Sequence, residues 1–294
     1  IDIKKKSLMN KKISASVYFA TVVALGGFIF GFDASVISGV IGFVSDEFNL
    51  NEWQQGFVVS SPTLGALFGS MFAGVCADIY GRKKVIITIA ALYVVSAIFS
   101  AFAVNFYMLV TARIIGGIAF ASLVLAPMYI AEISPAKYRG KMISINQLNI
   151  VIGFSAAYFA NYFLLQLSGG TNQLADTLGI TENVWRWMLG LEIIPAFLYL
   201  LLLFTIPESP RWLVVNKKLS QAKSVITKLF PAENASTVIE NIQKDHSNNT
   251  PPLMARIKEL FSNKMSFVLA VGLIVAVSQQ ITGVNAVYLH QYFN

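Results

Sequence analysis

Three ionisable side chains lie inside long apolar runs of the sequence, where a charge is rare. They are Asp33, Arg113 and Glu192. A charge at the centre of a bilayer costs at least ~2.5 kcal/mol on insertion scales, so such a residue is usually paired or functional. Burial favours the neutral form of a carboxylic acid, whereas a nearby arginine favours its ionised form. Asp33 and Arg113 are therefore predicted to form either a proton site, whose affinity changes with their separation, or a fixed ion pair that sets packing. For Glu192, three residues before Pro195, a place at the membrane surface or at a helix cap is the alternative to a functional role.

Polar amides interrupt two of the apolar runs. Asn146, Gln147 and Asn149 lie in one run, and Gln279, Gln280 and Asn285 lie in the last. An amide both donates and accepts hydrogen bonds, which suits the hydroxyl groups of a neutral polyol; a hydrogen bond between helices is the alternative for each amide. Gly283 permits a helix break that would turn Gln280 and Asn285 toward one cavity. Phe30 and Phe32 could offer a flat apolar face to a sugar ring.

The elements that must position these side chains are membrane-spanning helices. Of the 294 residues, 55% are apolar and only 13% are charged, whereas roughly a quarter of the residues of a soluble domain are charged. A helix needs about 20 mostly apolar residues to cross a bilayer. Seven runs meet this length, at residues 14–44, 55–76, 85–104, 107–131, 142–166, 187–206 and 265–292. The sequence thus predicts an all-α protein that crosses the membrane repeatedly.

No chemistry of an enzyme is evident in the sequence. It contains no nucleophile–base pair, no metal-ligand spacing and no phosphate-binding loop. We therefore expect a protein that is not an enzyme and that uses no metal and no cofactor.

The basic residues are distributed unevenly along the chain. Twenty of the 22 Lys and Arg residues fall in alternate connecting segments, beginning with the lysines before residue 14. Basic segments stay on the cytoplasmic side of a membrane, so we predict a cytoplasmic N-terminus in a cell (inner) membrane. The net charge of +7 then records topology and attraction to anionic lipid, and not nucleic-acid binding. In this topology Asp33 and Arg113 both lie in the outer half of the bilayer and can meet.

The long basic segment at residues 207–264 divides the chain. We predict a cytoplasmic N-terminus over residues 1–13, a six-helix transmembrane domain over 14–206, a cytoplasmic helical linker over 207–264, and the first helix of a second domain over 265–294. Amphipathic stretches at 219–230 and 236–244 predict short helices in the linker. Six spans followed by a long loop are typical of one half of a two-half transporter. A seven-helix receptor is disfavoured because its N-terminus lies outside the cell.

Short motifs along nearly the whole chain resemble those of the sugar porters of the major facilitator superfamily. They are GFDASVISG from Gly31, G-x3-D-x2-GRKK from Gly74, RIIGG from Arg113, PMYIAE-x6-RG from Pro127, Asn146-Gln147, PESPRWL from Pro207 and QQ-x2-G-x-N from Gln279. The aspartate–glycine–arginine motif marks only the superfamily, whereas the last two motifs together are specific for sugar porters. Among these, the chain resembles the bacterial proton–xylose symporters.

The resemblance implies a fold and a role for each matching residue. The fold is the six-helix N-domain, built as two three-helix repeats, followed by the linker and the first helix of the C-domain. The implied sugar contacts are Phe30, Gln147, Gln279, Gln280 and Asn285. The implied proton-coupling pair is Asp33 and Arg113. The implied charge network of the cytoplasmic gate is Asp78, Arg82, Glu132, Arg139, Glu208 and Arg211.

The resemblance also implies an activity. It is the proton-coupled import of a monosaccharide or polyol (a pentose, a hexose or inositol) by alternating access, carried out by a monomer whose partners are the sugar, protons and the lipid bilayer. A facilitator without proton coupling and a non-transporting membrane sensor of sugar are the alternatives. Sugar porters have about twelve spans, so this chain, which runs from Ile1 to Asn294, is expected to be the N-terminal part of a longer protein.

The sequence departs from the family pattern at two places. Fourteen steps separate Arg113 from Pro127, one fewer than in the family, and Phe120 and Ala121 stand where a glycine is expected. The loss of one residue rotates part of a helix by about 100°. Leu289 and His290 stand where the family has paired tyrosines at the outer gate.

Overall fold

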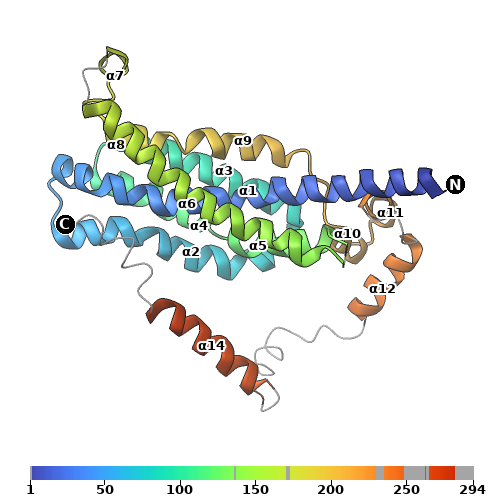
Figure 1. Ribbon diagram of the computed structural model, residues 1–294. Coiled ribbons are helices and arrows are strands. Elements are labelled where there is room, and N and C mark those ends of the chain that lie inside the picture. The colour runs from blue at the N-terminus through green and yellow to red at the C-terminus, as the bar shows by residue number, and fades with distance from the viewer. Residues whose placement is uncertain are drawn as a thin grey trace. The chain divides into compact units, whose positions relative to one another are not determined.

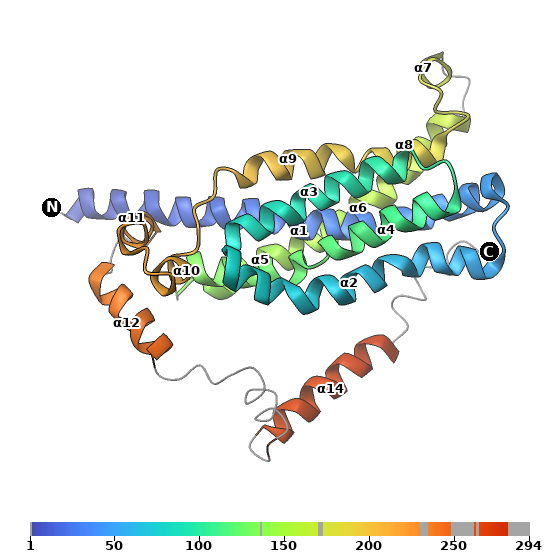
Figure 2. The ribbon, with the colours of Figure 1, turned by 180° about the vertical axis from the view of Figure 1, so that it is seen from behind.

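The computed structural model describes residues 2–135, 137–169, 173–229, 235–247, 262 and 265–281. Within these residues every regular element is a helix (Figures 1 and 2). The helices are α1 (Asp2–Phe48), α2 (Glu52–Tyr80), α3 (Arg82–Ala101), α4 (Phe106–Ala119), α5 (Ser122–Ile133), α6 (Arg139–Gly169), α7 (Gln173–Thr177), α8 (Val184–Gly190), α9 (Ile193–Leu203), α10 (Pro210–Val215), α11 (Leu219–Leu229), α12 (Ala235–Ser247) and α14 (Ser266–Ile281). The predicted all-α fold is confirmed.

Six helical stretches of the described chain are long and apolar enough to cross a membrane. They are Ala15–Phe48, Glu52–Tyr80, Arg82–Ala101, Phe106–Ile133, Arg139–Gly169 and Val184–Leu203. They run side by side along one axis in both views (Figures 1 and 2). These stretches correspond to the first six predicted spans. The seventh predicted span begins as α14, and its residues 282–292 lie outside the described residues.

Helix α1 packs along α6, and α2 packs along α4. Glycines allow the α1–α6 approach: a Cβ atom on Gly31 would overlap the backbone oxygen of Ile150, and one on Gly153 would overlap that of Phe28. Small residues at a helix crossing let two backbones come close in a membrane protein. The crossing places the α1 residues near position 30 directly against α6.

The fourth and sixth predicted spans each consist of two helices, α4 with α5 and α8 with α9. Between α4 and α5, Phe120 N donates to Gly117 O (2.9 Å) and Ala121 N to Ile118 O (3.2 Å), the three-residue spacing of a tight 3₁₀ turn. Between α8 and α9, the break precedes Pro195, which has no N–H to donate four residues back. Both breaks lie next to residues of the candidate site.

After the sixth span the chain forms α10 and then α11. Both helices lie at the end of the bundle nearer the N-terminus, where α11 packs against α1 (Figures 1 and 2). The predicted amphipathic helix at 219–230 is present as α11 and the one at 236–244 as α12. The chain divides into two compact units, residues 1–239 and 240–294. The predicted domain boundaries stay predictions.

Candidate functional site

A buried ion pair joins α1 to α4. Asp33 is 3% exposed and Arg113 is 1% exposed. Arg113 Nη1 donates to Asp33 Oδ1, and Arg113 Nη2 donates to the backbone oxygen of Asp33 at 3.2 Å. The structure therefore brings these two residues together, while their role in proton coupling stays a prediction.

Glu192 is a third charged group beside this pair, and we call Asp33, Arg113 and Glu192 the charge cluster. Glu192 lies in the break between α8 and α9, is 2% exposed and interacts electrostatically with both Asp33 and Arg113. Among the described residues, neither Asp33 Oδ2 nor Arg113 Nε has a hydrogen-bond partner. Two ionised carboxylates beside one guanidinium would leave an uncompensated negative charge shielded from water, which is unfavourable. One proton on either carboxyl group neutralises the charge cluster.

The predicted sugar contact on α1 is part of an aromatic cluster. Phe30 is half-buried, and its ring lies edge-on to Phe120, with centroids 4.7 Å apart and planes at 84°. It also lies edge-on to Phe154 of α6, at 6.3 Å. The ring of Phe30 is thus held between the α4–α5 junction and α6.

The other predicted sugar contacts lie on α6 and in the last part of the chain. Gln147 is exposed on α6, and no hydrogen bond within the described ranges engages its amide. The neighbouring Asn146 is buried and faces α1, where a Cβ atom on Gly27 would lie 3.0 Å from its Oδ1. Gln279 and Gln280 lie in α14, but their side chains and all of Asn285 lie outside the described residues, as do Leu289 and His290.

Four of the six predicted gate residues gather where α2 ends and α3 begins. Arg82 pairs with Asp78, with Nη1 and Oδ1 2.8 Å apart, and with Glu132 of α5, with Nε and Oε2 3.3 Å apart. Ser209 Oγ, just before α10, donates to Glu132. Arg82 of α3 therefore connects α2 to α5, and Glu132 connects α5 to the segment that follows the sixth span.

Glu208 attaches the same segment to α3. Its Oε1 accepts from Lys83 N at 3.1 Å and from Ser209 N at 2.8 Å. An acidic side chain at a helix N-terminus complements the unpaired N–H groups and the helix dipole. Gly81 before α3 has φ +100°, and a Cβ atom there would collide with the Glu208 carboxylate. Glycine is therefore required at this turn.

Arg139 and Arg211 are the two remaining predicted gate residues. Both are exposed, and in the described part of the chain no ion pair or hydrogen bond links either to Arg82, Glu132 or Glu208. In this structure they stand outside the network.

Three contributors were missed or underweighted by sequence reasoning. Glu192 was visible as a third charge in an apolar run, but its approach to Asp33 depends on the break before Pro195. Ser209 carries a helix-start signal, since it precedes proline and its Oγ accepts from Trp212 N at 3.3 Å. Phe120 was noted only as a residue that stands where the family has a glycine, and its contact with Phe30 was not predicted.

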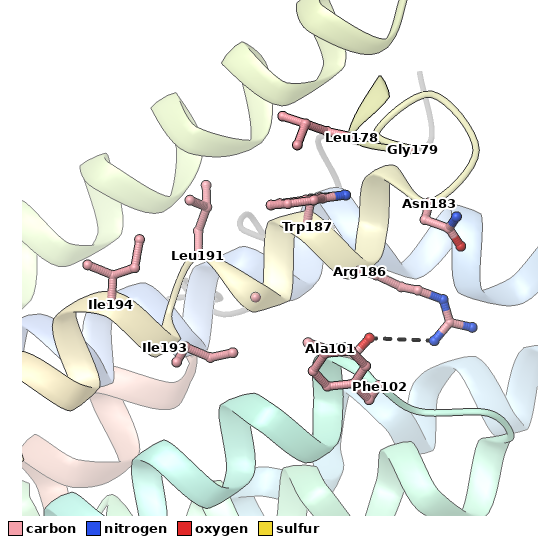
Figure 3. A pocket seen from close by; sticks show the side chains of 11 residues that line it. Ala101, Phe102, Leu178, Gly179, Asn183, Arg186, Trp187, Leu191, Ile193 and Ile194 are labelled. Carbon is pink, nitrogen blue, oxygen red and sulfur yellow. Dashed lines mark hydrogen bonds between the residues drawn. The ribbon is translucent and has the colours of Figure 1, made fainter. Parts of the chain in front are cut away.

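A separate cavity of about 470 Å³ lies at the opposite end of the bundle, between α3 and α8–α9 (Figure 3). Its apolar lining includes Phe102, Leu178, Trp187, Leu191, Ile193 and Ile194. Arg186 reaches across to the backbone oxygens of Ala101 (3.5 Å) and Ala103 (2.5 Å), and pairs with Glu47 at 2.7 Å. Among the residues that the structure describes, neither the charge cluster nor Phe30 and Gln147 line this cavity, so we do not assign it to the candidate site.

Comparison with known sequences connects this arrangement to one family. The family described as "Sugar (and other) transporter" matches residues 19–291. The arabinose-proton symporter of Bacillus subtilis (strain 168) is 34% identical over 273 residues, covering 92% of this chain and 56% of the relative. The galactose-proton symporter of Escherichia coli (strain K12) is 35% identical over 294 residues, covering 97% of this chain and 58% of the relative. The chain thus spans slightly more than half the length of these relatives, which are transporters and not enzymes.

Solved structures show the same fold. The proton:xylose symporter XylE of the major facilitator superfamily, bound to 6-bromo-6-deoxy-D-glucose, matches with a TM-score of 0.78 and 32% identity, over 93% of this chain and 61% of that chain. The partially occluded inward-open form of XylE from E. coli matches with a TM-score of 0.79 and 30% identity, over 94% of this chain and 64% of that chain. The chain therefore belongs to the sugar transporter family of the major facilitator superfamily.

Proposed function

We propose that the protein is a secondary active transporter, a monomer of the inner membrane, that imports a monosaccharide or polyol together with protons by alternating access. The observation that carries this proposal is the charge cluster of Asp33, Arg113 and Glu192, buried in a chain of the sugar transporter family. Because the chain spans 56% and 58% of two of its relatives, the activity is proposed for the protein to which these helices belong.

The geometry supports coupling between proton and sugar through α1. Asp33 follows Phe30 by three residues, about one helical turn. A movement of α1 that separates Asp33 from Arg113, or that admits water, would change the proton affinity of the carboxyl group. A sugar that contacts Phe30 favours one position of α1, and a ligand shifts a conformational equilibrium by its difference in affinity for the two states. The same turn of helix would then respond to both substrates.

The substrate class is supported by the side chains and by the names of the relatives. Relatives include arabinose-, galactose- and xylose-transporting proteins, which cover pentoses and hexoses. The ring of Phe30 offers an apolar face, and the amide of Gln147, which no hydrogen bond among the described residues engages, can donate to and accept from hydroxyl groups. A pentose, a hexose or inositol all fit this description.

The second candidate is a facilitator, and one observation favours it. Asp33 and Arg113 are fully buried and directly paired, as in an ion pair that only fixes the packing of α1 against α4. In that case sugar would move down its gradient without protons.

Proton movement separates the two candidates. In proteoliposomes with an internal pH dye, we expect sugar addition to acidify the lumen. Asp33→Asn should abolish proton-driven accumulation yet keep sugar exchange between the two sides, because Asn keeps the size and the acceptor oxygen but carries no charge. Full accumulation by Asp33→Asn would overturn the coupling role, and uptake without proton movement in the unmodified protein would establish the facilitator.

The sugar site is tested separately. Gln147→Ala should weaken sugar binding by about 3- to 10-fold, the equivalent of one net hydrogen bond, while sugar-dependent proton movement remains. Ser144→Ala, an exposed position one turn earlier on α6, is the matched control and should leave affinity unchanged. Equal affinities of all three proteins in a binding titration would remove Gln147 from the site.

A further inference from the structure

Helix α11 has two chemically opposite faces. Ala222, Ile226 and Leu229 are fully buried. At helical spacing, the opposite face carries Ser220, Lys223, Ser224, Thr227 and Lys228, and these residues line an open groove of about 590 Å³. The helix contains no acidic residue, so this face has a single sign of charge. We call it the basic face of α11.

The basic face lies near the predicted start of the first span. Lys228 Nζ stands 5.3 Å from the ring centroid of Phe19. Phe19 is buried in α1, five residues beyond residue 14, where hydropathy predicts that the span begins, a rise of about 7.5 Å along the helix. A lysine packed on this ring therefore reaches the depth of the lipid headgroups, as long basic side chains do at a membrane surface.

Helix α11 is connected to α10 through Lys218, the residue that precedes it, and α10 is connected to α2. Lys218 N donates to Leu213 O of α10 at 2.8 Å, and Lys218 Nζ lies 4.8 Å from the ring centroid of Trp212. Trp212 Nε1 in turn donates to Asp78 O at 2.9 Å. The residue before α11 is thus attached to α10, which is itself attached to α2, and α11 also packs against α1.

We propose that the basic face of α11 binds the headgroups of anionic phospholipids in the cytoplasmic leaflet. Lys223 and Lys228 supply two positive charges. Ser220 and Ser224 supply hydroxyl groups that, within the described part of the chain, no hydrogen bond engages, and these can donate to phosphate oxygens. A lysine near an anionic membrane surface contributes about 1 kcal/mol to binding. The proposal rests on the predicted topology, in which the N-terminus and the segment containing α11 lie on the cytoplasmic side. It does not depend on transport activity.

Native mass spectrometry of the purified protein, incubated with equal amounts of phosphatidylglycerol and phosphatidylcholine, tests this site. We expect a preference for phosphatidylglycerol that weakens with salt. Lys223→Gln/Lys228→Gln should reduce that preference by roughly 5-fold for each lysine removed, the equivalent of about 1 kcal/mol each. Ser220→Asp/Ser224→Asp, which keeps both lysines and the apolar face, should reduce it as well, so the test does not depend on one variant that fails to fold.

Lys137→Gln/Lys141→Gln is the matched control. It removes two exposed lysines at the start of α6, one of which also lies over an aromatic ring, Lys137 over Tyr138 at 5.7 Å. It should keep the phosphatidylglycerol preference. The proposal is overturned if the α11 variants keep the full preference, if the control loses as much as they do, or if inorganic phosphate displaces the lipid from the unmodified protein.

Discussion

Substitutions of Asp33 or Arg113 are expected to change both the stability of the fold and the proposed proton coupling. Each is almost inaccessible to water, and each makes its described hydrogen bonds within the pair. Removing one member of a buried ion pair typically costs 3–5 kcal/mol, chiefly because the other charge is left without a partner, whereas replacing both can be nearly neutral. A loss of transport after a single substitution therefore has to be distinguished from a loss of folding.

A double-mutant cycle makes that distinction. Arg113→Gln should lower the free energy of unfolding by about 3–5 kcal/mol, because Asp33 remains buried without its partner. Asp33→Asn/Arg113→Gln should regain at least half of this loss, because two neutral amides can hydrogen-bond to each other. Unfolding in mixed detergent micelles measures both effects. Additive losses would show that the two residues do not interact, and Arg139→Gln, at an exposed position, should change little.

At the scale of elements, a tight turn joins α4 to α5. Four backbone bonds of the three-residue kind link residues 117–124, the first from Phe120 N to Gly117 O and the last from Val124 N to Ala121 O. The junction also places Phe120 against Phe30.

The close crossing of α1 and α6 predicts how a substitution at Gly31 affects stability. Gly31→Ala should destabilise the protein by about 1–3 kcal/mol, because its Cβ atom would overlap the backbone of Ile150, which cannot move aside like a side chain. Gly42→Ala in the same helix is the control, since no atom lies within 4 Å of its added Cβ. Thermal unfolding in detergent compares the two. A smaller loss for Gly31→Ala than for Gly42→Ala would contradict the close approach.

At the scale of the molecule, the ion pairs of the described residues lie at three places along the bundle, one of which is the pair of Arg186 with Glu47 beside the cavity. The charge cluster lies within the spans, and the Arg82 network lies where α2 meets α3, together with the segment before α10. The Arg82 network ties three segments into one body at that end. In the proposed alternating access, the charge cluster would be the proton site and the Arg82 network would belong to the cytoplasmic gate.

The proposed topology is tested by labelling from the two sides of the membrane. In a Cys76→Ser background, Glu182→Cys, in the exposed segment before α8, should react with an impermeant maleimide in intact cells. Ser220→Cys on α11 should react only after permeabilisation. This follows because basic segments stay cytoplasmic. The reverse pattern would invert the topology and with it the lipid proposal.

The sequence by itself determined the membrane spans and the charged residues that lie within them. Hydropathy over about 20 residues is a local property, and so is the cost of a charge in an apolar run. Six spans and the pairing of Asp33 with Arg113 could therefore be predicted without coordinates. The sugar contacts Phe30, Gln147, Gln279, Gln280 and Asn285 were implied by the resemblance to the sugar porters and stay predictions; the side chains of Gln279 and Gln280 and all of Asn285 lie outside the described residues.

Only the tertiary structure decided which faces of the helices meet. Glu192 lies in the break between α8 and α9 and interacts with Asp33, and Phe120 lies in the tight turn after α4 and contacts Phe30. Ser209 joins Glu132, whereas Arg139 and Arg211 stay exposed. Spacing along a chain sets the angle between residues of one helix, but contacts between helices depend on breaks and crossings that involve residues far apart in sequence. For this reason the sequence predicted the helices and their charged residues, whereas the contacts between helices were known only from the tertiary structure.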